Sequence, residues 1–77
     1  MIEQQQYSRL KAALTRAIHS GKPEKIIATV KEARLIFNRE GWPDHWPLWR
    51  TAVDDLIFVK DDKVREAARI ESALWWG

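Results

Sequence analysis

The stretch Gly41-Trp42-Pro43-Asp44-His45-Trp46-Pro47 divides the 77-residue chain into two halves. Its two prolines fix the backbone angle φ, and each disfavours helix in the residue before it. The stretch therefore predicts a stiff connector between helices. The helix that follows begins in one of two ways: Asp44 is its N-cap, or Trp46 is the N-cap and Pro47 is the first helical residue.

Two helices are predicted before this connector, over residues 3–20 and 23–40, because apolar residues recur there at helical spacing. Gly21 and Gly41 stand where a left-handed C′ residue would end each helix. In the second helix, Phe37 and Trp42 then fall at C3 and C″, the apolar pair of a Schellman ending. The side chains expected in the core are Tyr7, Leu10, Leu14, Ala17 and Ile18 from the first helix and Ile26, Ile27, Val30, Ala33 and Phe37 from the second.

Two further helices are predicted after the connector, over residues 47–59 and 62–76, where glycine and proline are absent from Leu48 to Trp76. They are either separate or one continuous rod, and residues 56–59 also fit a short strand that has no partner. Asp61 and Asp62 suit the N-terminal dipole of the last helix. In the third helix, one face is expected to carry Trp46, Trp49, Val53, Leu56 and Ile57, and an adjacent face Leu48, Ala52 and Val59. In the fourth helix, the inward side chains are expected to be Val64, Ala67, Ile70 and Leu74.

The pattern as a whole predicts an all-α fold, a small three- or four-helix bundle with short loops punctuated by glycine and proline, in a single domain over residues 1–77. The composition, 45% hydrophobic and 31% charged, is that of an ordinary globular chain. No apolar run approaches the roughly 20 residues of a membrane span, and the N-terminus lacks a signal-peptide pattern. We expect a cytoplasmic protein. Its size and initial Met1 fit a complete small gene product, such as an accessory or phage-type regulator.

Catalytic and metal-binding patterns are missing from the sequence. Cysteine is absent, which excludes disulfides and thiolate sites. His19 and His45, the only imidazoles, do not have a metal-binding spacing. The doublets Asp54-Asp55 and Asp61-Asp62 lack the glycine bend of a calcium loop. We therefore expect no enzyme, no cofactor, no metal and no small-molecule substrate.

Protein binding explains the most features of the sequence. Five tryptophans exceed what so small a core is expected to bury, and tryptophan is enriched at binding hot spots. Trp75 and Trp76 diverge by about 100° on a helix, so we expect Trp75 in the core and Trp76 outside it. The second helix is apolar on more than one side, which is typical of a helix that is central in its bundle or covered by a partner. We predict a non-enzymatic interaction module, binding a partner protein or self-associating, with interface residues Leu35, Ile36, Trp46, Trp49 and Trp76.

Nucleic-acid binding is the alternative, and it rests on an uneven distribution of charge. Residues 1–39 contain eight basic and three acidic side chains, whereas residues 40–77 contain five basic and eight acidic ones. A basic half can contact phosphates without reading sequence, or it can belong to a helix-turn-helix-like arrangement. The same imbalance favours head-to-tail association of copies. The candidate nucleic-acid contacts are Arg9, Arg16, Lys22, Lys25 and Arg39.

Overall fold

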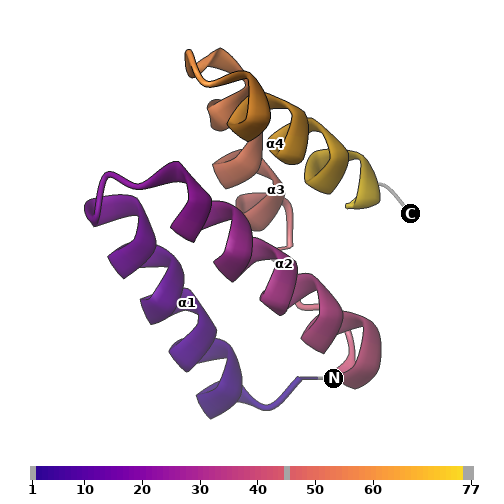
Figure 1. Ribbon diagram of the computed structural model, residues 1–77. Coiled ribbons are helices and arrows are strands. Elements are labelled where there is room, and N and C mark those ends of the chain that lie inside the picture. Colours follow the sequence, from indigo (N-terminus) through magenta and orange to yellow (C-terminus); the bar gives the residue numbers. More distant parts are fainter. Residues whose placement is uncertain (1, 45, 76–77) are drawn as a thin grey trace.

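The computed structural model describes residues 2–44 and 46–75, and this part of the chain is helical without any strand. The described residues form four α-helices, and a short 3₁₀ helix follows the third; their arrangement can be followed in Figure 1. The all-α fold class predicted from the sequence is thereby confirmed. The helices are α1 (Gln4–His19), α2 (Pro23–Glu40), α3 (Pro47–Asp54), η1 (Asp55–Phe58) and α4 (Asp62–Leu74).

Helix α2 is the central element, because it packs against α1, α3 and α4. Helices α1 and α2 run side by side in opposite directions, and α3 and α4 lie on the other side of α2 (Figure 1). The principal extents of the molecule are 36, 27 and 15 Å, so it is flat. The central position of α2 explains why its sequence is apolar on more than one side.

Glycine ends the first two helices, but in two different ways. Gly21 has a φ of 71°, as expected for a left-handed C′ residue. Gly41 has a φ of 114° and a ψ of 150°, outside the left-handed helical region, so the predicted Schellman ending is wrong. Its N–H continues the helical pattern by donating to the Phe37 carbonyl at 2.8 Å. The expected apolar contact nevertheless forms, with 5.9 Å between the ring centroids of Phe37 and Trp42.

The third predicted helix is shorter than the sequence indicates. It begins with Trp46 as N-cap and Pro47 in the first turn, which is the second of the two alternatives for its start. The α-helix ends at Asp54, and the next four residues form the 3₁₀ helix η1 instead of continuing to residue 59. The tighter winding of η1 buries Leu56 and leaves Phe58 84% exposed. Helices α3 and α4 are therefore separate.

Asp61 caps α4, since its side chain accepts hydrogen bonds from the backbone N–H groups of Lys63 at 2.9 Å and Val64 at 3.3 Å. We expect Asp61→Ala to lower the free energy of unfolding by about 1 kcal/mol, because two N–H groups of the first turn lose their acceptor. Urea denaturation followed by circular dichroism measures the change. The matched control is Asp44→Ala, an exposed carboxylate in the connector, and equal effects of the two variants would contradict the capping role.

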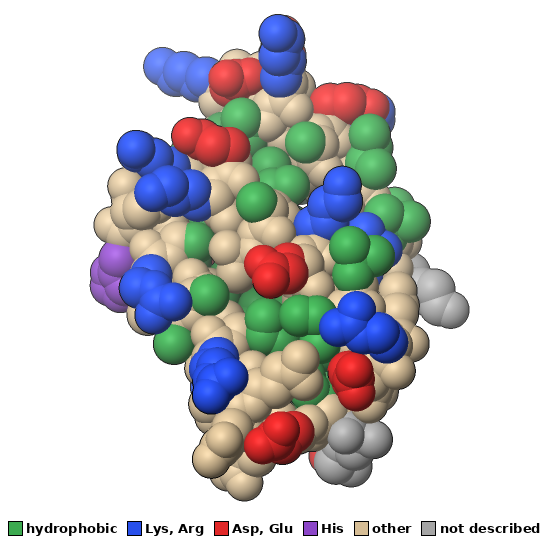
Figure 2. Space-filling model, turned by 60° about the horizontal axis from the view of Figure 1, so that its bottom comes forward, with side chains coloured by type: hydrophobic (Ala, Val, Ile, Leu, Met, Phe, Trp, Pro, Cys, Tyr) green, Lys and Arg blue, Asp and Glu red, His purple; other side chains and the backbone are tan. Residues whose placement is uncertain are grey.

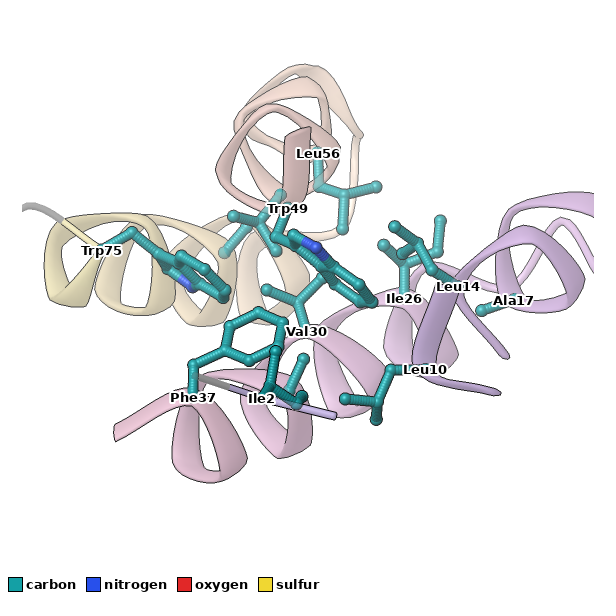
Figure 3. Packing of buried hydrophobic residues seen from close by; sticks show 13 residues of the cluster. Ile2, Leu10, Leu14, Ala17, Ile26, Val30, Phe37, Trp49, Leu56 and Trp75 are labelled. Atoms are coloured by element: carbon teal, nitrogen blue, oxygen red, sulfur yellow. The ribbon is translucent and has the colours of Figure 1, made fainter. Parts of the chain in front are cut away.

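The hydrophobic core is centred on the contact of α2 with α3. Trp49, Phe37, Val30 and Val53 are its largest fully buried side chains. Figure 3 shows Trp49 in the middle of the cluster, with Phe37 and Trp75 on one side and Leu14 on the other. The remaining buried hydrophobic residues are Ile2, Leu10, Leu14, Ala17, Ile26, Ala33, Leu56, Ala68 and Trp75.

The inward face of α4 differs from the one predicted. Its buried positions are Ala68, Glu71, Ser72 and Trp75, whereas Ile70 and Leu74 are exposed. The helix is rotated because two polar residues occupy inward positions and have partners there. Glu71 pairs with Arg34 of α2, and the Ser72 hydroxyl donates to Asp54 of α3. Ile18, also expected in the core, is likewise exposed.

Candidate protein-binding surface

Trp49 lies in the core and is not available as a surface anchor. It is 0% exposed, and its ring makes edge-on contacts with Phe37, at a centroid distance of 5.5 Å, and with Tyr7 at 6.2 Å. The prediction of Trp49 as an interface residue is therefore wrong. This small core buries more than one tryptophan, since Trp75 is buried as well as Trp49.

Trp46 is half-buried beside the core. Its ring stacks on Trp75 at a centroid distance of 6.5 Å and meets Trp42 edge-on at 5.9 Å. Trp75 is buried, as expected from its helical phase, and Trp76 lies outside the described residues. The four described tryptophans thus belong to one packed group, which explains their number structurally. The members of this aromatic cluster are Tyr7, Phe37, Trp42, Trp46, Trp49 and Trp75.

Leu35 and Ile36, the two aliphatic interface candidates, occupy different environments on α2. Ile36 is half-buried and packs against the core. Leu35 is 51% exposed. Because consecutive helical residues diverge by about 100°, the two side chains cannot belong to one flat contact. Of this pair, Leu35 is the one that remains on the surface.

An apolar groove runs between α2 and α4, and we call it the α2–α4 groove. Its volume is about 300 Å³. On α4, Ala67, Ile70 and Leu74 follow one another at i, i+3 and i+7, so they form one strip along the helix. Ile70 is 55% exposed and Leu74 is 48% exposed. The groove is lined by Ile27, Lys31, Arg34, Ala67, Ile70, Glu71 and Leu74.

The floor of this groove is a buried ion pair. Arg34 Nε donates to Glu71 Oε2 at 2.6 Å, and the side chains are only 12% and 5% exposed. Glu71 Oε2 also accepts a hydrogen bond from Trp75 Nε1 at 3.0 Å. A buried carboxylate needs such partners to offset the loss of its hydration. The pair therefore lies at the bottom of the groove, and its two opposite charges neutralise each other.

Leu35 extends the exposed apolar surface beyond the groove. It follows Ile27 and Lys31 at i+8 and i+4 along α2, so it lies one turn after Lys31 at the groove's outer rim. Figure 2 shows one face of the molecule, on which hydrophobic side chains reach the surface between Lys and Arg side chains. Leu35, Ile70 and Leu74 are three of the eight large hydrophobic residues that are exposed among residues 2–44 and 46–75.

A second hollow, of about 400 Å³, lies beside η1 and the outer face of α4. It is lined by Ile57 and by charged residues that pair with one another, Asp62 with Arg65 and Glu66 with Arg69. The hydrogen bond to Glu66, together with that carboxylate's negative charge, raises the pKa of Arg69 above its ordinary value. The paired charges that line this hollow therefore leave it with no net charge to offer a ligand.

The structure brings together some, but not all, of the basic residues that are predicted to contact nucleic acid. Arg16 and Lys25 line one hollow of about 380 Å³ between α1 and α2, whereas Lys22 is in the loop that joins these helices. Arg9 is exposed two turns before Arg16. Within the described residues, none of these four side chains forms an ion pair. Arg39 is separate, near the end of α2, and pairs with Glu40 at 3.3 Å.

The comparisons with known proteins do not indicate a function. No family model, no curated protein and no solved structure matches the chain. Among the described residues, no group of three or more histidine or acidic side chains is placed to hold a metal ion. No helix formed by those residues has both the length and the apolar character that a membrane crossing requires.

Sequence reasoning missed Ile70 and Leu74 as surface residues. Their signal was present, because Ala67, Ile70 and Leu74 make an apolar strip at helical spacing. The strip was assigned to the core, as an apolar helix face usually is. Only the partners of Glu71 and Ser72 show that the neighbouring, more polar face of α4 points inward.

Proposed function

We propose that this protein is a small, non-enzymatic protein–protein interaction module of the cytoplasm, an accessory or phage-type regulator, inhibitor or assembly subunit that acts by occupying a partner's surface. One observation carries the proposal: Ile70 and Leu74 are exposed along a single groove, and Leu35 is exposed one turn after Lys31, which lines the same groove. Isolated exposed hydrophobic residues are normal in soluble proteins, but adjacent ones mark interaction sites. Other side chains form the hydrophobic core, so Leu35, Ile70 and Leu74 are available to bind a partner.

The proposal is tested by affinity co-purification of the tagged chain from its own source cells at moderate salt, with and without nuclease. We expect a partner protein to remain bound after nuclease treatment, in a fixed stoichiometric ratio, because an apolar contact does not depend on nucleic acid. Recovery of the chain alone, as a monomer by sedimentation, would contradict the proposal. If the chain is recovered as a self-associated oligomer, the partner is a second copy of the same chain.

Nucleic-acid binding is the second candidate, supported by the placement of Arg16 and Lys25 along one hollow and by the absence of ion pairs at Arg9, Arg16, Lys22 and Lys25 within the described part of the chain. Unpaired cations of this kind contact phosphates without reading sequence. In the same co-purification, bound nucleic acid and the loss of every bound protein on digestion would favour this candidate over the first.

A further inference from the structure

We propose that the α2–α4 groove binds an amphipathic helix of a partner protein, which inserts apolar side chains between Ile27, Ile70 and Leu74 and places a carboxylate against Lys31. The inference rests on the proposed interaction function and specifies its site and the chemistry of the partner.

The groove is suited to side chains carried on a helix. A volume of about 300 Å³ is too small for a helix, whose diameter with side chains is about 10–12 Å, but it accepts one or two large apolar side chains. An amphipathic helix lying over a groove presents such anchors at i, i+3 or i+4, and i+7. The strip of Ala67, Ile70 and Leu74 has this same spacing. A helix lying along α4 would therefore keep its anchors in register with the strip.

The charges of the groove favour an acidic occupant. Three charged residues line it, and two of them, Arg34 and Glu71, neutralise each other. Lys31 is exposed and forms no ion pair within the described residues. Two turns before Lys31 on α2 and two turns before Ile70 on α4, Glu24 and Lys63 carry opposite charges, so together they do not alter this balance. The groove is left with one positive charge at its edge, which a carboxylate of the partner would complement.

The same charge disfavours a second copy of this chain as the occupant. In a two-fold symmetric dimer, the same patch is present on both sides of the interface. Two α2–α4 grooves facing each other would bring two unpaired Lys31 side chains into one interface, with no unpaired carboxylate among the residues that line the groove to balance them. The carboxylate that lines the groove, Glu71, is already paired with Arg34 and buried. A different protein with an acidic, amphipathic helix therefore fits the groove better than self-association does.

The test is a selection of helical peptides against the full-length protein. The probe is a displayed library of an alanine-based helix in which the i, i+3, i+4 and i+7 positions and their flanking positions vary among Leu, Ile, Phe, Glu, Lys and Ser. We expect selected peptides to carry apolar residues at the anchor positions and Glu at the flanks. Binding should be lost with Ile70→Asp and retained with Phe58→Ser, which alters an exposed hydrophobic residue away from the groove.

Charge reversal tests the role of Lys31. Glu-flanked peptides should bind Lys31→Glu about two- to fivefold more weakly than the wild type, the range expected for one exposed ion pair. Selection against Lys31→Glu should enrich Lys at the flanks instead. The inference is overturned if no peptide is enriched, if selected peptides bind Ile70→Asp as well as the wild type, or if the flanks show no preference for Glu.

Failure of this inference can be distinguished from failure of the proposed function. If co-purification with Ile70→Asp retains the same partner protein as the wild type, the α2–α4 groove is not the site, but the interaction function stands. If the wild type retains no protein, the function itself fails. If the wild type sediments as a dimer and Ile70→Asp as a monomer, a second copy occupies the groove and the proposed partner is wrong.

Discussion

Trp49→Ala is expected to lower the free energy of unfolding by about 3–5 kcal/mol, the usual cost of removing a buried tryptophan from a core. Trp49 is fully buried and contacts both Phe37 and Tyr7, so alanine would leave a large void between α1, α2 and α3. A single hydrophobic core in a chain of about this length rarely supplies more than about 3–5 kcal/mol of total stability. We therefore expect the variant to be largely unfolded at 37 °C. Urea denaturation followed by circular dichroism at 222 nm measures the loss.

Two other variants control for the removal of an aromatic ring as such. Phe58→Ala removes an exposed ring and should leave the denaturation midpoint almost unchanged. Trp49→Phe keeps an aromatic ring in the core and should cost less than alanine. It also removes Trp49 Nε1, a buried donor that has no hydrogen-bond partner within the described residues. A Trp49→Ala variant as stable as the wild type would mean that this side chain is not a core residue.

Glu71→Ala is expected to cost about 3–5 kcal/mol, because it leaves the buried charge of Arg34 without its partner. The Trp75 indole N–H would lose its acceptor as well. The substitution removes the floor of the α2–α4 groove at the same time. Urea denaturation measures the effect, and tryptophan fluorescence reports the change around Trp75.

The double variant Arg34→Met/Glu71→Leu separates pairing from simple loss of volume. It should recover most of the stability lost by Glu71→Ala, since apolar residues of similar size replace a buried pair at little cost. The remaining deficit, of about 1–3 kcal/mol or less, comes from the unpaired Trp75 N–H. In the exposed pair of Glu66 and Arg69, Glu66→Ala should leave the denaturation midpoint nearly unchanged. A double variant as unstable as Glu71→Ala would show that charge pairing is not the cause.

The helices themselves could be predicted from the sequence, because their ends depend on local chemistry. Gly21 adopts a positive φ that other residues disfavour, and Pro47 can only begin a helix. The end of α3 could not be predicted in this way, since residues 55–59 contain neither glycine nor proline. There the 3₁₀ winding of η1 depends on the burial of Leu56, which is a tertiary contact.

The candidate surface was harder to predict, because it depends on which face of each helix points inward. Ile70 and Leu74 look like core residues in the sequence, whereas Glu71 looks like a solvent-exposed one. Glu71 is buried only because Arg34, 37 positions earlier, reaches it from α2. Conversely, two tryptophans that are predicted to lie at an interface pack against other aromatic rings in the structure. Trp46 and Trp49 are predicted as anchors from their residue type alone, but they complete a cluster whose members come from α1, α2, the connector, α3 and the end of α4.

The central position of α2 also determines where the chain tolerates change. Helix α2 packs against α1, α3 and α4, and on its exposed side it bears Leu35. A substitution at Val30, Ala33 or Phe37 therefore disturbs a packed contact, whereas an exposed polar position such as Glu32 can vary more freely. Mutational robustness is in this way distributed unevenly within one helix: the same eighteen residues supply part of the core and part of the surface that would bind a partner.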